Sequence, residues 1–254
     1  MGPQGPFPFL SINMNITIAG YGPVGKAHHK LLQSHWINIY DPQKGFPNFT
    51  NPDCVIICVS TPPRKDGSCE MKNVWEVIDK APNVPILIKS TISIDGWDML
   101  IDNFPDKQIC FSPEFLRAKT ATEDLLNTKE ILIGGNNVDF WSKVFDCDIV
   151  VSDPRALILS KYFRNAFLAT KVNFFNQMYD LCKALDMDYN IVKQFVVQDT
   201  RIGSSHTKIT DERGFGGHCF PKDVQALLSI AKKHNVDLSL VREALAYNNI
   251  IQSL

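Results

Sequence analysis

The apolar positions follow two different patterns along the chain. Up to about residue 135, short β-prone runs alternate with turns that contain glycine, proline or other polar residues. These runs predict strands at residues 15–19, 36–40, 54–59, 86–89, 108–111 and 130–133. Short buried runs with long connections between them are typical of a parallel sheet in an α/β protein.

The second half of the chain has a helical pattern. Asp153 and Pro154 form a strong helix start, because an acidic N-cap accepts backbone N–H bonds and proline suits the first helical position. The pattern continues to about Leu185, which gives a helix of about 30 residues, longer than usual in a globular domain. Such a helix needs apolar partners along its length, so we expect it to be the spine of a dimer or of a contact between domains. Further helices are predicted from Pro221 to about His234 and from Leu238 to Ile251.

These patterns predict two domains after an irregular tail at residues 1–13. Residues 14–151 are expected to form the domain with the sheet, and residues 152–254 an α-helical central domain. The connection from Pro42 to Asp53 is short and rich in proline, so a loop is predicted there in place of a crossover helix.

The composition favours a soluble globular protein. Of the 254 residues, 44% are hydrophobic and 21% are charged, and the net charge of −1 offers no electrostatic footprint for nucleic acid or an anionic membrane. No apolar run is long enough to span a bilayer. The seven cysteines include no C-x-x-C pair and no zinc-binding spacing, which is typical of reduced thiols. We therefore expect a cytoplasmic protein that binds no metal, nucleic acid or membrane.

The turn after the first predicted strand has the spacing of a dinucleotide-binding loop. Its glycines allow a tight turn, close approach to a pyrophosphate and close helix packing. Asp41 ends the second predicted strand about 20 residues later, where an acid accepts hydrogen bonds from the adenosine ribose and repels a 2′-phosphate. The alternative for Asp41 is a turn residue before Pro42. We predict a Rossmann-like domain that binds NAD. The turn residues expected at the cofactor are Gly20, Tyr21, Gly22, Pro23, Val24 and Gly25.

Three later predicted strands end in polar residues. Ser60, Thr61 and Pro62 follow the third strand, Thr91 follows the fourth, and Glu114 follows the fifth. Ligands of open α/β sheets bind outside the carboxyl ends of the strands. The pattern therefore predicts one shared cleft, although capping a helix or turn is the alternative for each residue taken singly.

The segment from Gly214 to Asp223 contains the clearest candidate for covalent catalysis. Cys219 lies directly after a glycine-rich turn and before Pro221, which suits the start of a helix. A thiol at a helix N-terminus loses its proton more readily and is a better nucleophile. Asp223 follows one helical turn later, so its carboxylate is expected near the sulfur. The alternative is a buried cysteine at a tight turn, and His218 is interpreted as a turn residue.

These segments occur in the order found in the UDP-glucose/GDP-mannose dehydrogenase family, which the chain resembles from about residue 14 to residue 251. The segments that carry the resemblance are residues 20–25, 59–62, 89–91, 112–117, 165–171 and 214–223. The resemblance implies four-electron, NAD-dependent oxidation of a nucleotide sugar, of the type that converts UDP-glucose to UDP-glucuronate. It also implies a homodimer through the long helix at residues 153–185.

The resemblance implies a role for each catalytic candidate. Cys219 resembles the nucleophile that holds the intermediate aldehyde as a thiohemiacetal and then as a thioester. Lys161 and Asn165, four residues apart and therefore on one helical face, resemble the pair beside the reacting oxygen. Lys161 is implied to stabilise an alkoxide or to move a proton, and Asn165 to bond that oxygen or an ordered water. Without the resemblance, a solvated surface lysine is the alternative for Lys161.

Further roles follow from the same resemblance. Asp223 is implied to orient water and Lys161, and Glu114 with Thr91 to position the water that hydrolyses the thioester. Arg201 resembles an arginine that reaches the substrate across a dimer interface, and its alternative is a surface charge. The implied substrate contacts are Glu114, Phe115, Leu116, Lys161, Asn165, Arg201, Phe215, Gly216 and Gly217. The implied cofactor contacts beyond the glycine turn are Asp41, Ser60, Thr61, Pro62, Thr91, Glu114 and Lys222.

The chain also departs from the family pattern. Ala118 stands where the family has a second glutamate, and a third, nucleotide-binding domain is expected to be missing beyond Leu254. Three hypotheses therefore stay open. The first is an active nucleotide-sugar dehydrogenase of minimal form, and the second is an impaired NAD-binding, dimerising module that needs a separate nucleotide-sugar-binding domain. The third, a simple two-electron hydroxyacid dehydrogenase, leaves Cys219 without a purpose.

Overall fold

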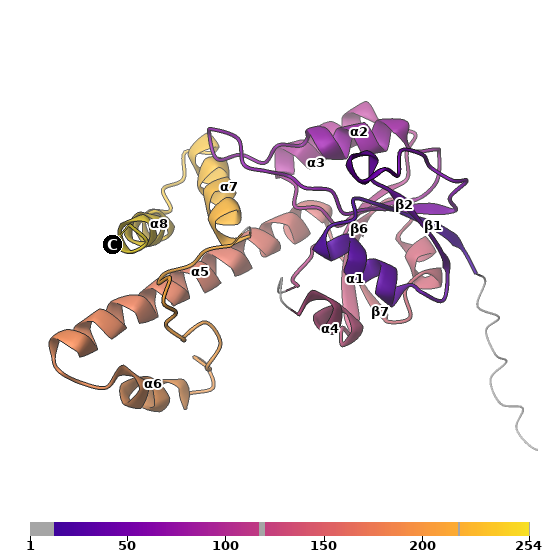
Figure 1. Cartoon of the computed structure of the whole chain (residues 1–254). Helices are drawn as coiled ribbons and strands as arrows, with labels where there is room; N and C mark the ends of the chain where they lie inside the picture. Colours follow the sequence, from indigo (N-terminus) through magenta and orange to yellow (C-terminus); the bar gives the residue numbers. More distant parts are fainter. Residues whose placement is uncertain (1–12, 117–119, 218, 254) are drawn as a thin grey trace, which may run out of the picture. The chain divides into compact units, whose positions relative to one another are not determined.

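The structure is a computed structural model that describes residues 13–116, 120–217 and 219–253 (Figure 1). Ala118, His218 and most of the expected tail at residues 1–13 lie outside the described residues. The chain divides into two compact units. The first unit consists of Met1–Thr61, Met71–Thr91 and Asp95–Leu157, and the second of Pro62–Glu70, Ile92–Ile94 and Ile158–Leu254. The boundary expected between residues 151 and 152 stays a prediction.

The described part of the first unit contains a sheet of seven strands in the order β2-β1-β3-β4-β5-β6-β7. The strands are β1 (Asn15–Ala19), β2 (Trp36–Tyr40), β3 (Cys54–Ile57), β4 (Ile86–Ile88), β5 (Ile109–Phe111), β6 (Glu130–Gly135) and β7 (Asp148–Val151). All neighbours are parallel except β5 and β6. The strand order reverses at β1, and the carboxyl ends of strands beside such a reversal form the ligand crevice of α/β sheets. The predicted α/β fold with a Rossmann-like sheet is confirmed.

The far edge of the sheet was not predicted. β7 is a short and mostly exposed strand, so its sequence lacks the buried apolar run that marks the other strands. β6 runs antiparallel to β5 and ends at Gly135, whose φ is +127°. A Cβ on Gly135 would lie 2.4 Å from the Ile109 carbonyl oxygen, so only glycine lets the strands approach this closely.

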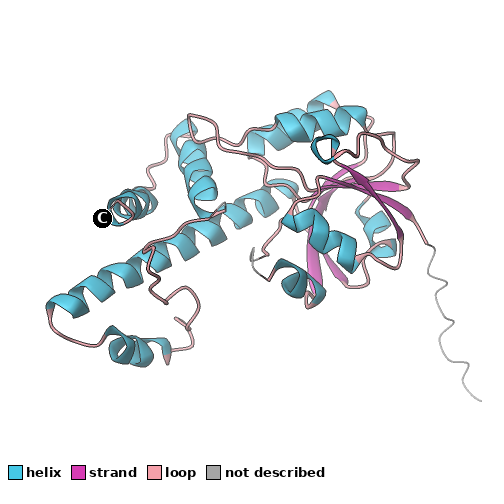
Figure 2. Ribbon diagram, in the orientation of Figure 1, coloured by secondary structure: helices cyan, strands magenta, loops and turns pink. Residues whose placement is uncertain are grey.

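Helices cover both faces of the sheet in the first unit (Figures 1 and 2). The helices are α1 (Pro23–Leu31), α2 (Lys72–Lys80), α3 (Ile94–Asn103) and α4 (Ala121–Leu126). α1 and α4 lie on one face, and α2 and α3 lie on the other. The core on the α1 face includes Ile16, Ile56 and Trp141, all with 0% exposure. Burial of each of these isoleucine side chains contributes about 2 kcal/mol.

The second unit is built mainly from helices, as predicted. They are α5 (Pro154–Ala184, which begins in the first unit), α6 (Tyr189–Val197), α7 (Phe220–Lys233) and α8 (Ser239–Ile251). The predicted start of α5 is confirmed, because the Asp153 carboxylate accepts the Ala156 N–H at 3.0 Å. The sequence analysis missed α6, whose Tyr189 packs against Tyr179 of α5 at a ring-centroid distance of 5.6 Å. None of the described helices is both long enough and apolar enough to cross a membrane.

His28 of α1 is a titratable side chain with 0% exposure. Its Nδ1–H donates to the Val24 carbonyl oxygen at 2.9 Å, and its Nε2 has no hydrogen-bond partner among the described residues. Burial, and after it the charge of Lys89, lowers the His28 pKa from 6.5 to about 4 against the opposing effects of Glu114 and the Val24 carbonyl. The folded chain therefore keeps His28 neutral where the unfolded chain protonates it.

The free energy of unfolding should decrease as pH falls from 6.5 towards 4, because the unfolded chain then binds a proton that the folded chain excludes. The contribution of His28 to this slope is at most about 1.4 kcal/mol per pH unit. Urea unfolding between pH 7 and pH 5 measures it. His28→Asn keeps a donor for Val24 but does not titrate, so its slope should be smaller. The exposed His234→Asn is the control, and an unchanged slope in His28→Asn would contradict the assignment.

Candidate functional site

The glycines of the β1–α1 turn have different surroundings. Gly20 has a φ of +91°, and a Cβ there would lie 2.8 Å from the backbone of Cys58 and Val59. A Cβ on Gly25 would lie 2.1 Å from the carbonyl oxygen of Gly20. Around Gly22, by contrast, no described atom outside Gly22 and its two chain neighbours lies within 4 Å of the Cβ position. The fold therefore requires Gly20 and Gly25, whereas Gly22 leaves the backbone accessible to a ligand.

The first turn of α1 carries amides that no described side chain caps. Gly22 is the N-cap residue and Pro23 is the first helical residue, while the Lys26 N–H bonds the Gly22 carbonyl at 2.9 Å. The N–H groups of Val24 and Gly25 have no intrahelical partner and point out of the helix start. Together with the positive end of the helix dipole, they fit the pyrophosphate of a dinucleotide.

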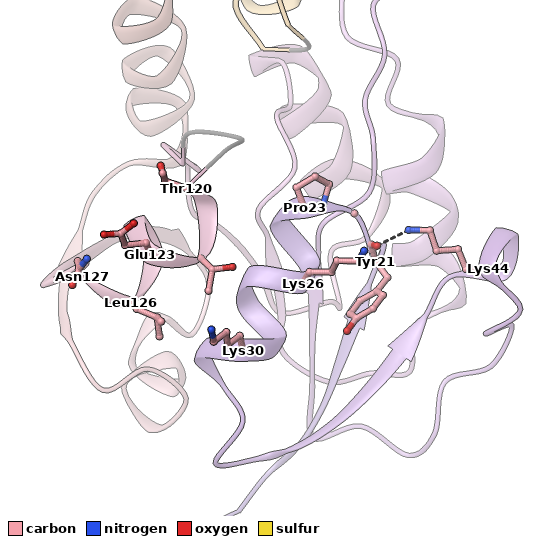
Figure 3. Close-up of a pocket in the computed structure, with 11 residues that line it drawn as sticks. Tyr21, Pro23, Lys26, Lys30, Lys44, Thr120, Glu123, Leu126 and Asn127 are labelled. Atoms are coloured by element: carbon pink, nitrogen blue, oxygen red, sulfur yellow. Dashed lines mark hydrogen bonds between the residues drawn. The ribbon is translucent and has the colours of Figure 1, made fainter. Parts of the chain in front are cut away.

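Asp41 lies beside this turn, as the sequence predicts for an acid that binds the adenosine ribose. Its Oδ2 accepts the Tyr21 N–H at 2.9 Å and lies 3.8 Å from the Lys44 Nζ. The Lys44 ammonium also donates to the Tyr21 carbonyl oxygen (Figure 3). The Asp41 carboxylate is therefore fixed next to the glycine turn, and its contact with a ribose stays a prediction.

A hollow of about 870 Å³ opens over the turn (Figure 3). Its lining residues come from the turn, from α1, from the loop after β2 and from the α4 region. They are Tyr21, Gly22, Pro23, Lys26, Lys30, Lys44, Thr120, Thr122, Glu123, Leu126 and Asn127. This volume lies within the range of roughly 300–1,000 Å³ that is typical of small-molecule sites. Three of the predicted cofactor residues thus line a space of the size of a ligand.

The residues after β4 and β5 form a buried ion pair. The Lys89 Nζ lies 3.6 Å from Glu114 Oε2 and donates to Ser112 Oγ at 2.9 Å. Glu114 Oε1 accepts the N–H groups of Phe115 at 2.8 Å and Leu116 at 3.1 Å. These bonds fix the carboxylate of Glu114. Lys89 was not predicted as a site residue. Its position directly after an apolar strand was the feature of the sequence that could have indicated such a role.

The other polar residues after the strands of the first unit occupy the same edge of the sheet. Ser60 and Thr61 follow β3, and the Asn73 side chain donates to the Ser60 carbonyl oxygen at 2.9 Å. Thr91 follows β4 and is half-buried. Pro62 belongs to the second unit. Because β3, β4 and β5 are adjacent and parallel, the structure brings Ser60, Thr61 and Thr91 to the edge that Glu114 occupies.

Asp223 of α7 is the centre of a buried polar cluster in the second unit, with 1% exposure. Its Oδ2 accepts the Asn165 Nδ2–H at 2.6 Å, and its Oδ1 accepts the Lys222 ammonium at 2.6 Å. Lys161 is also buried and lies one turn before Asn165 on α5. A buried carboxylate is costly unless it is paired and hydrogen-bonded, so these contacts hold Asp223 in place.

A buried pair that was not predicted lies beside this cluster. The Tyr162 hydroxyl donates to the Ile92 carbonyl oxygen at 2.9 Å, and the Cys69 Sγ lies 3.3 Å from the same hydroxyl. Burial raises the pKa of Cys69, while the charges of Lys222 and, more weakly, Lys161 oppose this rise. Through Tyr162, α5 therefore holds two short segments of the second unit next to Lys161. These segments are Pro62–Glu70, which contains Cys69, and Ile92–Ile94.

Cys219 is the exposed thiol among the seven cysteines, all of which are described and none of which is in a disulfide. It is the N-cap residue of α7, and its carbonyl oxygen accepts the Asp223 N–H at 2.9 Å. Its Sγ has no hydrogen-bond partner in the described chain. The Asp223 carboxylate bonds Asn165 and Lys222, and its expected proximity to the sulfur stays a prediction. The alternative of a buried cysteine is excluded.

The loop before Cys219 is fixed by a buried asparagine of α8. The Asn248 Oδ1 accepts the Phe215 N–H at 2.7 Å, and the Asn248 Nδ2 donates to the Phe215 carbonyl oxygen at 3.0 Å. Gly214 has a φ of +58°, and a Cβ there would lie 2.4 Å from the Asn248 Oδ1. Phe215 is buried, whereas Gly216 and Gly217 are exposed. The role of Asn248 was not predicted, because its partner Phe215 lies 33 positions away in the sequence.

Arg201 lies on the loop after α6 and is not brought into the Asp223 cluster. Its side chain is 88% exposed, and it bonds the Asp199 carboxylate at 2.5 Å. Within the described residues of this chain, Arg201 therefore has the geometry of a surface ion pair. A role towards a second subunit stays a prediction.

The chain matches two domains of one protein family. Residues 43–144 match the NAD binding domain of the UDP-glucose/GDP-mannose dehydrogenase family, and residues 157–250 match its central domain. The UDP-glucose 6-dehydrogenase of Rickettsia bellii is 34% identical over 222 residues, which are 80% of this chain and 51% of that protein. The chain spans about half the length of the curated relatives that it matches. The matched NAD binding domain identifies the cofactor as NAD.

Solved structures share the fold. The UDP-glucose dehydrogenase of the archaeon Pyrobaculum islandicum aligns with a TM-score of 0.81 at 25% identity, over 97% of this chain and 70% of that chain. The 3-hydroxyisobutyrate dehydrogenase of Mycobacterium tuberculosis aligns with a TM-score of 0.73 at 14% identity, over 94% of each chain. At that identity the second likeness shows the fold alone.

Two substitutions to alanine in the glycine turn should affect different properties: Gly22→Ala should weaken NAD binding, and Gly25→Ala should destabilise the fold. Gly22→Ala should leave the free energy of unfolding within about 0.5 kcal/mol of the wild type. It should weaken NAD binding roughly tenfold, because its methyl group occupies the open space beside the helix start. Gly25→Ala should destabilise the fold by about 1–3 kcal/mol through its contact with Gly20. Thermal denaturation and calorimetric titration measure both, and wild-type NAD affinity in Gly22→Ala would refute the prediction.

The exposed thiol at the start of α7 lies within the matched central domain, and the glycine turn and Asp41 directly precede the residues matched to the NAD binding domain. Those domains account for most of the sheet and of the helices described above. The chain belongs to the UDP-glucose/GDP-mannose dehydrogenase family.

Proposed function

We propose that this chain supports the NAD-dependent oxidation of a nucleotide sugar's primary alcohol to a carboxylate, of the type that converts UDP-glucose to UDP-glucuronate. The observation that carries the proposal is the cluster in which Asn165 of α5 meets Lys222 and Asp223 of α7, the helix whose N-cap residue is the exposed Cys219. A two-electron hydroxyacid dehydrogenase has no use for such a thiol. The relatives named UDP-glucose 6-dehydrogenase support the substrate class. The cysteines, none of them in a disulfide, support a cytoplasmic location.

The thiol explains how two oxidations can occur at one carbon. When NAD is bound, it accepts the hydride that leaves this carbon in each oxidation. After the alcohol has become an aldehyde, the Cys219 sulfur bonds the carbonyl carbon and the oxygen takes up a proton, which gives a thiohemiacetal. Loss of the second hydride and of the hydroxyl proton leaves a thioester. Water then adds to the thioester carbon, and the carbon–sulfur bond breaks to release the carboxylate and the thiol.

The remaining residues stabilise charge and position water. Lys161 supplies a positive charge beside the reacting oxygen. One N–H of the Asn165 amide bonds Asp223, which fixes the amide so that the second N–H can donate to the same oxygen. Glu114, held by Lys89 and by two backbone amides, positions the hydrolytic water together with Thr91.

We also infer a homodimer formed through α5. Four exposed apolar side chains recur along it at spacings of four and seven residues, which places them on one stripe. They are Phe163 (56% exposed), Phe167 (68%), Phe174 (52%) and Leu181 (53%). A second copy of the chain carries the same stripe, so a two-fold contact buries both stripes. Arg201 then becomes available to the substrate of the partner.

A second candidate function is an NAD-binding and dimerising module that does not turn over. One observation favours it: Ala118 stands where the family pattern has a glutamate. Such a module binds NAD but forms no NADH with UDP-glucose, GDP-mannose or UDP-N-acetyl sugars. NADH formation with any of these substrates excludes it.

The oxidation of UDP-glucose should produce two NADH for each UDP-glucuronate. Cys219→Ser should lower acid formation by at least roughly a hundredfold, because the aldehyde is no longer held covalently. Its affinity for NAD should stay that of the wild type. Cys147→Ser, at a half-buried thiol of the first unit, is the matched control and should keep full activity. Acid formation by Cys219→Ser at the wild-type rate would refute the role of the thiol.

The dimer is tested by sedimentation of a doubly substituted chain. Phe167→Ser with Phe174→Ser removes the two central side chains of the stripe and should convert the dimer to a monomer. Leu240→Ser, at a side chain of α8 that is 72% exposed, should leave the dimer intact. A monomeric wild type, or a double variant that stays dimeric, would contradict the proposed interface.

A further inference from the structure

We propose that Arg213 is a positioning residue, which fixes the turn at Gly214 and Phe215 on the segment that leads to Cys219. Arg213 was not predicted as a functional residue, and none of the roles described above depends on it. Its effect on the reaction rests on the proposed function, since only there does the thiol act on a nucleotide sugar. Its binding of the turn is independent of that function.

The turn has a conformation that the backbone alone does not favour. Arg213 has a φ of +55°, and Gly214 has a φ of +58°. Glycine adopts this left-handed region freely, whereas a residue with a side chain is unfavourable there. Such a residue persists only where surrounding contacts determine its conformation, and such positions are common at active sites. The contacts of the Arg213 side chain are therefore expected to hold the turn.

Three residues of α5 bind the guanidinium of Arg213. The Arg213 Nε–H donates to Asn176 Oδ1 at 2.8 Å, and the Nη2 group donates to the two carboxylate oxygens of Asp180 at 2.8 and 2.9 Å. The guanidinium carbon also lies 4.9 Å from the ring centroid of Tyr179, which is a cation–π distance. A lysine ammonium cannot make these contacts together, because it lacks the planar set of donors.

Asn176 joins the side chain of Arg213 to the backbone of the turn. The same Asn176 Oδ1 accepts the Gly214 N–H at 3.2 Å. The Asn176 Nδ2 donates to the Val172 carbonyl oxygen at 2.9 Å, which fixes the orientation of the amide. Asn176 is 1% exposed, so the loss of a donor leaves its oxygen less well bonded and out of reach of water. One buried amide therefore holds the arginine and the next backbone N–H.

The helix α8 binds the same turn and the same carboxylate. The Tyr247 hydroxyl donates to Asp180 Oδ2 at 2.9 Å. Asn248, the next residue of α8, bonds both the N–H and the carbonyl oxygen of Phe215. The turn is therefore bound to α5 through Arg213 and to α8 through Asn248, and Asp180 links the two helices.

Arg213 differs from the arginine of a surface ion pair. Its side chain is 24% exposed and its carboxylate partner lies 33 positions away, whereas Arg201 pairs with a carboxylate two positions away. A pair between neighbours in the sequence constrains one loop, but a distant pair ties a loop to a helix. Gly216 and Gly217 follow the turn directly, so the contacts of Arg213 set where the segment to Cys219 begins. A shift of about 1 Å in a reacting group can lower a rate roughly a hundredfold.

The test compares three single variants. R213A removes every contact of the guanidinium, whereas D180N removes the charge of its partner but keeps the bond to Asn176. R242A is the matched control, because Arg242 is an exposed arginine of α8 that pairs with Asp237. D180N removes fewer contacts than R213A, so it decides the question if R213A does not fold.

Two kinds of measurement separate the binding of the turn from the reaction. Hydrogen exchange followed by mass spectrometry measures the protection of the Gly214 and Phe215 amides in the absence of substrate. Steady-state kinetics measures kcat and KM for UDP-glucose, and calorimetry measures the Kd of NAD. Thermal denaturation measures the stability of each variant.

In R213A the two turn amides should exchange at least roughly fivefold faster than in the wild type, while the amides of α5 and α8 keep their rates. Its kcat for UDP-glucose should fall about tenfold. The Kd of NAD should not change, because the glycine turn belongs to the first unit. D180N should show the same changes at a smaller size, and R242A should show neither. A merely stabilising role would lower the melting temperature and leave the exchange at the turn and kcat, measured well below that temperature, at wild-type values.

Three results would overturn the proposal. They are wild-type exchange of the turn amides in R213A (or in D180N, if R213A does not fold), wild-type kcat in a variant whose turn exchanges faster, and equal changes in R242A. A wild-type chain that forms no NADH with UDP-glucose contradicts the proposed function instead. The exchange rates then still decide whether Arg213 holds the turn.

Discussion

The pairing of buried charges is the constraint on which both chemical centres of this chain depend. In the first unit the ammonium of Lys89 holds the carboxylate of Glu114, and in the second unit Asp223 is held by Asn165 and Lys222. A charge removed from water is tolerated only with such partners. Burial therefore fixes the orientation of each carboxylate. His28 is buried without a charged hydrogen-bond partner among the described residues, and its lowered pKa keeps it neutral instead.

The glycine turn of the first unit depends on close backbone packing and on backbone amides that the fold leaves without a partner. Gly20 and Gly25 let the backbone pack so closely that no side chain fits, whereas Gly22, at the start of α1, lines the hollow. The amides of this helix start have no side-chain cap among the described residues, so they lack a hydrogen-bond partner. A cofactor with a pyrophosphate supplies that partner. Rigid contacts thus place the turn, and the uncapped amides beside them fit the pyrophosphate of the cofactor.

Local signals predicted the features that depend on neighbouring residues. The helix cap at Asp153 and the lack of a crossover α-helix after Asp41 need only a short stretch of sequence, and both are confirmed, although the segment expected to be a loop begins with a 3-10 helix at Pro42–Lys44. Contacts between distant residues gave no such signal. Lys89 acts through its ion pair with Glu114, and Asn248 through its hydrogen bonds to Phe215. Each partner lies far away in the sequence. The hydrogen bonds of the Asp223 carboxylate to Asn165 and Lys222 also gave no local signal, because Asn165 lies 58 positions away.

The central claim is that Cys219 carries the sugar through its second oxidation, and intact-protein mass spectrometry tests this most directly. Glu114→Gln should slow thioester hydrolysis, so this variant should accumulate an acyl adduct after incubation with NAD and UDP-glucose. The mass of the chain should rise by that of the acyl group, and peptide mapping should place the group on Cys219. UDP-glucuronate formed without an adduct on Cys219 would contradict the claim.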